Sequence, residues 1–156
     1  MPAGHSRWTL PLLRWSMGLF LALWGADKLV AAAGAQRIFT TFYQVPVGPT
    51  AVRLAGAAEI VLGLLLAAGL FRVPVAWLTL AVNTVSTVAS WRQILDPWGV
   101  LGLGKGGSHL FLASIVLVAV SVVLVLESRD ATRPVDARPG REPTGRAPAA
   151  LDPERR

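Results

Sequence analysis

The sequence contains no cysteine, and it has few charged residues for its length. Without a thiol, the chain cannot form a disulfide, a thiolate metal site or a cysteine nucleophile. Charged residues make up 15% of the 156 residues, against roughly 25% in a typical soluble protein. The few charges are also segregated, because they are sparse between Trp15 and Leu126. The sequence therefore indicates that the middle part of the chain is too poor in charge to be exposed to water.

Four apolar segments are long enough to cross a bilayer, which takes about 20 residues in helical form. They cover about 10–33, 51–71, 74–91 (after a tight turn at 72–74) and 109–127. Hydrocarbon offers no water to the backbone, so such segments are helical. The sequence predicts an all-α integral membrane four-helix bundle over residues 1–127. The alternative, a soluble helical protein with a large apolar core, would have too little polar surface to cover four such segments.

The two ends of the chain predict its orientation in the membrane. Four spans place both termini on one side, which then carries ten Lys and Arg residues against five on the other. Because cytoplasmic segments are enriched in Lys and Arg, we expect both termini in the cytoplasm and the protein in the plasma membrane. Residues 128–156 are rich in charge, Pro and Ala and almost lack large apolar side chains, which predicts a disordered tail.

The segment from Gly34 to Pro49 has two interpretations. Ile38, Phe39 and Phe42 fall at helical spacing, opposite polar neighbours, which suits a short helix lying in the outer membrane interface. An ordinary loop agrees equally well with the same residues.

Ionisable residues inside an apolar span are costly, so they are candidates for a functional site. Asp27 and Lys28 lie in the first predicted span and Glu59 in the second. Lys28 shares a helical stripe with Gly18 and Gly25 and should face the bundle, because small residues let helices approach closely.

The third predicted span carries a polar stripe that includes Asn83 and Thr87, which we expect to face the bundle rather than lipid. His109 begins the fourth span on the same side of the membrane. Measured along the helices, all these groups fall in the outer half of the bilayer. The sequence thus predicts a polar pocket between the helices, open to the outside, with Lys28 and Glu59 setting its charge and Asn83 and Thr87 donating hydrogen bonds.

Such a pocket could be functional or purely structural. The functional interpretation is a site for a polar headgroup, a quinone, an ion or a proton. The structural one is an ion pair of Lys28 with Glu59 or Asp27 that fixes helix packing. His109 is better explained as an interfacial histidine than as a metal ligand, and we expect no metal site. Gly99, Gly104 and Lys105 imitate a phosphate-binding loop, but no strand precedes them and a glycine replaces the hydroxyl residue.

The ordered polar and glycine positions resemble those of the DoxX-like membrane proteins, over roughly residues 7 to 127. The first span carries arginine, glycine, aromatic, glycine and lysine in family order, here Arg14, Gly18, Phe20, Gly25 and Lys28. A loop with Phe42 and Pro46 follows, and the second span then carries Glu59, Gly63, Gly69 and Arg72. The resemblance departs at Asp27, a residue not expected at that position. It also departs at Ser108-His109, in the loop before the fourth span, where the family often has an acidic residue.

The resemblance implies a four-helix bundle with a link to membrane redox chemistry. The preferred hypothesis is a non-catalytic, redox-associated subunit or anchor whose pocket holds a quinone or a lipid, with no covalent cofactor. Electron transfer would then need the quinone or a partner's cofactor. The alternative is a small transporter or proton-coupled permease acting as a homo-oligomer. Stand-alone catalysis and nucleic-acid binding are not expected.

Overall fold

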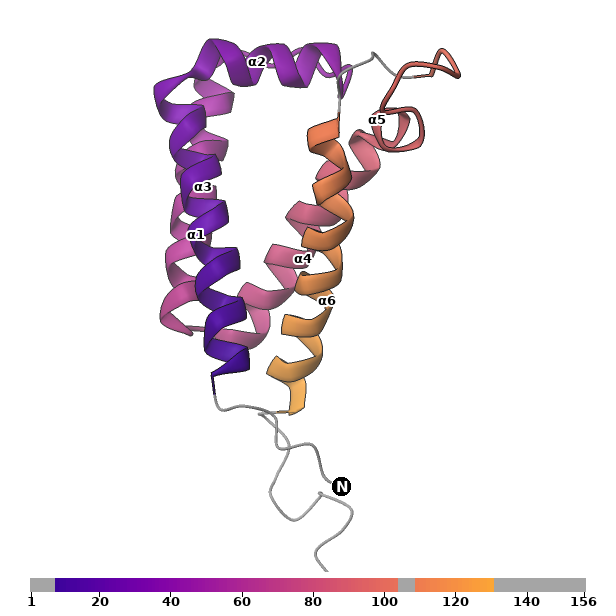
Figure 1. Ribbon diagram of the computed structural model, residues 1–156. Coiled ribbons are helices and arrows are strands. Elements are labelled where there is room, and N and C mark those ends of the chain that lie inside the picture. Colours follow the sequence, from indigo (N-terminus) through magenta and orange to yellow (C-terminus); the bar gives the residue numbers. More distant parts are fainter. Residues whose placement is uncertain (1–7, 104–108, 131–156) are drawn as a thin grey trace, which may run out of the picture.

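The computed structural model describes residues 8–103 and 109–130, and every regular element within these ranges is a helix. The four long helices are α1 (Thr9–Val30), α3 (Pro49–Ala68), α4 (Arg72–Ala89) and α6 (Ala113–Asp130). The three short ones are α2 (Ala32–Thr41), α5 (Trp91–Leu95) and the 3-10 helix η1 (His109–Leu112). The prediction of an all-α bundle is confirmed. Figure 1 shows the four long helices running lengthwise through it, with α2 lying across one end.

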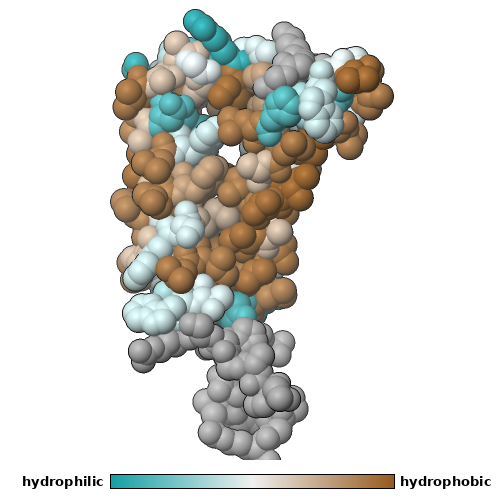
Figure 2. Space-filling model, in the orientation of Figure 1, coloured by the Kyte–Doolittle hydropathy of each residue, from teal (hydrophilic) through white to brown (hydrophobic). Residues whose placement is uncertain are grey.

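Two of the described helices are by themselves long and apolar enough to cross a membrane. They are α3 and the continuous helical segment from His109 to Arg129. α1 and α2 meet the same criterion only together, and a bend of 103° separates them. α4 is less apolar, because it begins at Arg72 and carries a polar stripe around Asn83. The hydrophobic side chains nevertheless cover the visible flank of the bundle from one polar end to the other (Figure 2).

Glycines hold α1 and α3 in backbone contact. Gly18 lies against Gly63, and Gly25 lies against Gly56, so the two antiparallel helices touch at points two turns apart. A methyl group on Gly18 would lie 2.5 Å from the carbonyl oxygen of Gly63, and one on Gly56 would lie 2.6 Å from that of Gly25. Only glycine permits this separation. The second long pair, α4 and α6, packs beside the first.

The apolar core joins the two pairs at the end of the bundle opposite α2. It takes two buried residues from each long helix: Met17, Leu21, Leu62, Leu66, Val75, Ala76, Leu124 and Val125. The turn between α3 and α4 closes this end, with Gly69 at φ 69° and Phe71 at φ 45°. The turn was predicted at residues 72–74, but those residues already belong to α4. Pro74 fits there because the first helical turn needs no N–H donors.

The structure decides between the helix and the loop that the sequence left open for the segment after the first span. Residues 32–41 form a helix rather than a loop, and it is packed on the end of α3 through Ala32, Ala35 and Val52. The Gln36 side chain donates a hydrogen bond to the carbonyl oxygen of Val47, 2.9 Å away, and so fastens the returning chain. The predicted first span, 10–33, was therefore too long, since α1 ends at Val30.

Three further spans differ in their bounds from the sequence prediction. α3 covers Pro49–Ala68 rather than 51–71. α4 ends at Ala89, and the short α5 turns the chain away before the loop that follows. α6 continues to Asp130, so the first three residues of the predicted tail are helical. The rest of that tail, 131–156, lies outside the described residues, as do 1–7 and 104–108, which include two residues of the phosphate-loop-like pattern.

Candidate ligand cavity

A cavity of about 410 Å³ lies between the α1–α3 pair and the α4–α6 pair, next to α2. We call it the inter-pair cavity. Its apolar wall is strongly aromatic and includes Phe20, Trp24, Phe39 and Phe111. Its polar side chains come from all sides of the space: Asp27, Lys28, Tyr43, Glu59, Asn83, Ser86 and Ser114. Ligand sites commonly have this composition, a mostly apolar wall with a few polar groups.

The first polar feature of the wall is the ion pair between Lys28 on α1 and Glu59 on α3. The ammonium nitrogen lies 2.6 Å from Glu59 Oε2, and the side chains are only 7% and 16% exposed. Side chains lean toward the N-terminus of their own helix. Because α1 and α3 are antiparallel, Lys28 and Glu59 lean toward each other across the Gly25–Gly56 contact. Lys28 also lies over the Trp24 ring, 5.4 Å from its centroid.

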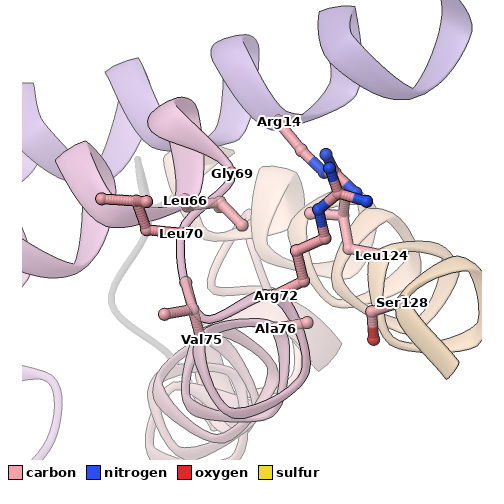
Figure 3. Close-up of a pocket in the computed structure, with 9 residues that line it drawn as sticks. All are labelled: Arg14, Leu66, Gly69, Leu70, Arg72, Val75, Ala76, Leu124 and Ser128. Atoms are coloured by element: carbon pink, nitrogen blue, oxygen red, sulfur yellow. The ribbon is translucent and has the colours of Figure 1, made fainter. Parts of the chain in front are cut away.

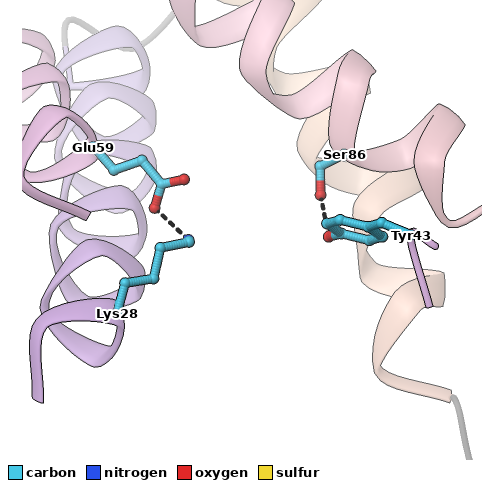
Figure 4. Close-up of polar contacts among 4 residues, drawn as sticks. All are labelled: Lys28, Tyr43, Glu59 and Ser86. Atoms are coloured by element: carbon cyan, nitrogen blue, oxygen red, sulfur yellow. Dashed lines mark hydrogen bonds and ion pairs between the residues drawn. The ribbon is translucent and has the colours of Figure 1, made fainter. Parts of the chain in front are cut away.

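The second polar feature faces the first across the cavity. The Tyr43 hydroxyl lies 2.8 Å from the Ser86 hydroxyl. Figure 4 shows these two residues opposite Lys28 and Glu59. Burial raises the pKa of the Tyr43 phenol, so it stays protonated and able to donate a hydrogen bond at neutral pH. Phe39 packs edge-on against the Tyr43 ring at 5.3 Å and holds it in place.

Asn83 and Thr87 serve the packing of α4 against α6. Asn83 is 4% exposed and reaches the edge of the inter-pair cavity, but its amide donates a hydrogen bond to Ser121, 2.9 Å away. The Thr87 hydroxyl donates to the carbonyl oxygen of Asn83 at 2.7 Å. Thr87 does not line the cavity. The polar stripe predicted on this helix is therefore divided between the helix interface and the cavity, which Ser86 faces.

The two remaining predicted site residues lie apart from the ion pair. Asp27 lines the inter-pair cavity and is exposed, and within residues 8–103 and 109–130 it forms no ion pair. His109 is exposed and packs edge-on against Trp98 at 5.8 Å, outside the cavity. In the described part of the chain, no three His, Asp or Glu residues converge as metal ligands would.

Sequence reasoning missed Tyr43. It is the one tyrosine of the chain, and it follows an amphipathic segment whose direction depends on the bend after Val30. The apolar stripe of Ile38, Phe39 and Phe42 was the available signal, because a helix turned across the bundle brings the next aromatic residue over its interior.

The cavity's groups suit a flat, weakly polar guest. The Lys28 ammonium and the Tyr43 hydroxyl can donate hydrogen bonds to carbonyl oxygens from opposite sides, and the aromatic wall can stack on a ring. Lys28 and Glu59 neutralise each other, so an uncharged guest leaves no ion unpaired.

Comparison with known proteins identifies the family. The family model named DoxX matches residues 9–91, which run from the start of α1 to the start of α5. No curated protein and no solved structure matches the chain. The matched region contains the glycine contact, the Lys28–Glu59 pair, Tyr43 and Ser86. Because it covers more than half of the chain, this protein belongs to the DoxX family.

Proposed function

We propose that this protein is a non-catalytic membrane subunit that binds a quinone headgroup in the inter-pair cavity and presents it to a redox partner. The observation that carries the proposal is the pairing of two donor groups, Lys28 and Tyr43, on facing walls of a largely aromatic cavity. One wall is built from α1 and α3, and the other from the end of α2 and α4.

Binding would place the quinone ring among Trp24, Phe39 and Phe111. The ammonium of Lys28 would donate to one carbonyl oxygen while keeping its contact with Glu59, and the Tyr43 hydroxyl would donate to the other. A quinone supplies reversible two-electron chemistry when bound. This chain has no cysteine, and the described residues form no metal cluster, so electrons would come from a partner's cofactor.

The arrangement favours binding over transport, which is the alternative function. The apolar core around Leu21, Leu66 and Leu124 fills the end of the bundle opposite α2. A permease would require the two helix pairs to separate there. Flux of protons or small solutes in liposomes would support the transporter, and absence of flux under every imposed gradient would count against it.

Quinone titration of the full chain in nanodiscs tests the proposal. A short-tailed quinone should quench tryptophan fluorescence saturably, because Trp24 lines the inter-pair cavity. Ala89 also lines it, so Ala89→Phe should fill the space and weaken binding at least tenfold. Ala57→Phe is the matched control, because Ala57 is exposed on α3 and does not line the cavity.

The removal of one donor gives a finer readout. Tyr43→Phe should weaken binding by about tenfold, the value of one buried hydrogen bond, without changing a charge. Unchanged binding in Ala89→Phe would refute the cavity as the quinone site. If mass spectrometry finds a phospholipid in the wild type and not in Ala89→Phe, the cavity holds lipid rather than quinone.

A further inference from the structure

A second site lies at the opposite end of the bundle, where two arginines from different helices converge. Arg14 comes from α1, and Arg72 is the first residue of α4. Figure 3 shows their guanidinium groups overlapping in projection above a small hollow between Gly69, Leu124 and Ser128. The groups are close enough for their charges to repel each other.

Within residues 8–103 and 109–130, no ion pair or hydrogen bond joins an acidic side chain to Arg14 or Arg72. The Lys28–Glu59 ion pair lies at the other end of the bundle. The charge of Glu127 reaches Arg14 only as a longer-range attraction. The positive end of α4 adds to the repulsion at Arg72, because the macrodipole favours anions there. Two facing cations with one partial counter-charge form a costly arrangement that a bound anion would make favourable.

The position along the bundle indicates where the anion comes from. The exposed tryptophans Trp8, Trp15 and Trp77 lie in the same part of the bundle, at the start of α1 and in the second turn of α4. Tryptophans are enriched at the depth of lipid headgroups. Basic pockets between membrane helices at that depth bind phosphate-bearing headgroups.

We propose that Arg14 and Arg72 form a binding site for a phosphate group, which the headgroup of a membrane phospholipid or free phosphate supplies. Guanidinium forks bind phosphate oxygens in pairs, so two of them clamp one group. The hollow has a volume of about 10 Å³, room for a water molecule but not for a phosphate. The phosphate therefore lies at its mouth, between the two guanidinium groups. This site is independent of the inter-pair cavity.

Thermal unfolding of the full chain in a neutral detergent tests the site with defined probes. Short-chain phosphatidylglycerol should raise the melting temperature saturably, whereas diacylglycerol, which has no phosphate, should not. Arg72→Gln should weaken the apparent affinity for phosphatidylglycerol by about tenfold, as expected for the loss of a charge-assisted hydrogen bond. The affinity of Arg72→Lys should lie between those of the wild type and Arg72→Gln, because lysine keeps the positive charge but lacks the two-pronged guanidinium group.

Arg53→Gln is the matched control, because Arg53 is an exposed arginine near the start of α3, at the end that carries α2. Its affinity should equal that of the wild type. Equal affinity in Arg72→Gln and wild type, or equal losses in Arg72→Gln and Arg53→Gln, would overturn the proposal. Inorganic phosphate that reproduces the wild-type shift identifies a free anion as the ligand, and a shift with phosphatidylglycerol alone identifies the lipid.

Discussion

Lys28 and Glu59 depend on each other more than on any other residue. Each is nearly buried, and a single contact of 2.6 Å neutralises both charges. Removing one charge leaves the other in a region with little water to solvate it, whereas removing both leaves no unpaired buried charge. At this scale the pair acts as one neutral unit in the wall of the inter-pair cavity.

A double-mutant cycle measures that dependence. Lys28→Met and Glu59→Leu should each lower the free energy of unfolding by about 3 kcal/mol, because each leaves a buried charge unpaired. The double variant should recover most of this loss. Arg37→Met, at an exposed position on α2, should change little. Detergent-induced unfolding followed by circular dichroism gives the values, and additive losses in the double variant would contradict the coupling.

Single residues were predicted from the sequence to different extents. Lys28 and Glu59 could be placed inward, because facing lipid would be too costly and the glycine stripe marks the packed face of α1. Asn83 and Thr87 could be assigned to a polar stripe, but not divided between cavity and interface, since that depends on how α6 packs. Tyr43 was missed, because the apolar stripe before it does not show where the chain turns, and the bend lies among alanines, which carry no local signal for a break.

The α1–α3 contact depends on four glycines that act as two pairs. Gly18 and Gly25 present backbone to Gly63 and Gly56, and no side chain separates the helices at these points. The same contact brings Lys28 and Glu59 together, so the cavity's charged wall depends on the glycines as well. The glycine spacing is visible in the sequence, but the pairing of specific glycines requires the antiparallel register that the structure supplies.

Substitution of these glycines separates packing from helix propensity. Gly63→Ala should lower the free energy of unfolding by about 1–3 kcal/mol, because the added methyl group meets backbone that cannot rotate away. Gly34→Ala is the matched control, since a methyl group there meets nothing within 4 Å. It should be neutral or stabilise by up to about 1 kcal/mol, as alanine favours the helix. Thermal unfolding gives the comparison. Equal changes in the unfolding free energy of Gly63→Ala and Gly34→Ala would contradict the close contact.

The described part of the molecule is a bundle of four long helices. Of these, α3 meets the length and apolarity of a membrane span on its own, and α6 does so together with η1, as the segment His109–Arg129. Sequence reasoning found all four, because a long apolar run is a strong signal that depends on no tertiary contact. It placed the ends of all four wrongly by a few residues, because helix ends depend on caps, bends and packing. The direction of α2 lies beyond the sequence, since it is set by contacts with the end of α3.

The number of crossings and the orientation can be measured directly, because a chain without cysteine has no labelling background. Four crossings predict that Thr9→Cys and Leu70→Cys react with an impermeant thiol reagent only from the cytoplasmic side. Thr50→Cys and Val100→Cys should react only from the other side, and denaturant should make all four reactive. Labelling of Leu70→Cys and Val100→Cys from the same side would show that α4 does not cross.

The two helix pairs are joined by the core at one end and separated by the inter-pair cavity at the other. A small rotation about the joined end would widen or narrow the space near α2 while leaving the core packed. The angle between the pairs is then set by the thickness of the guest. A bulkier guest would spread the outer surface of the bundle near α2, so a protein bound to that surface would respond to occupancy without any contact with the guest itself.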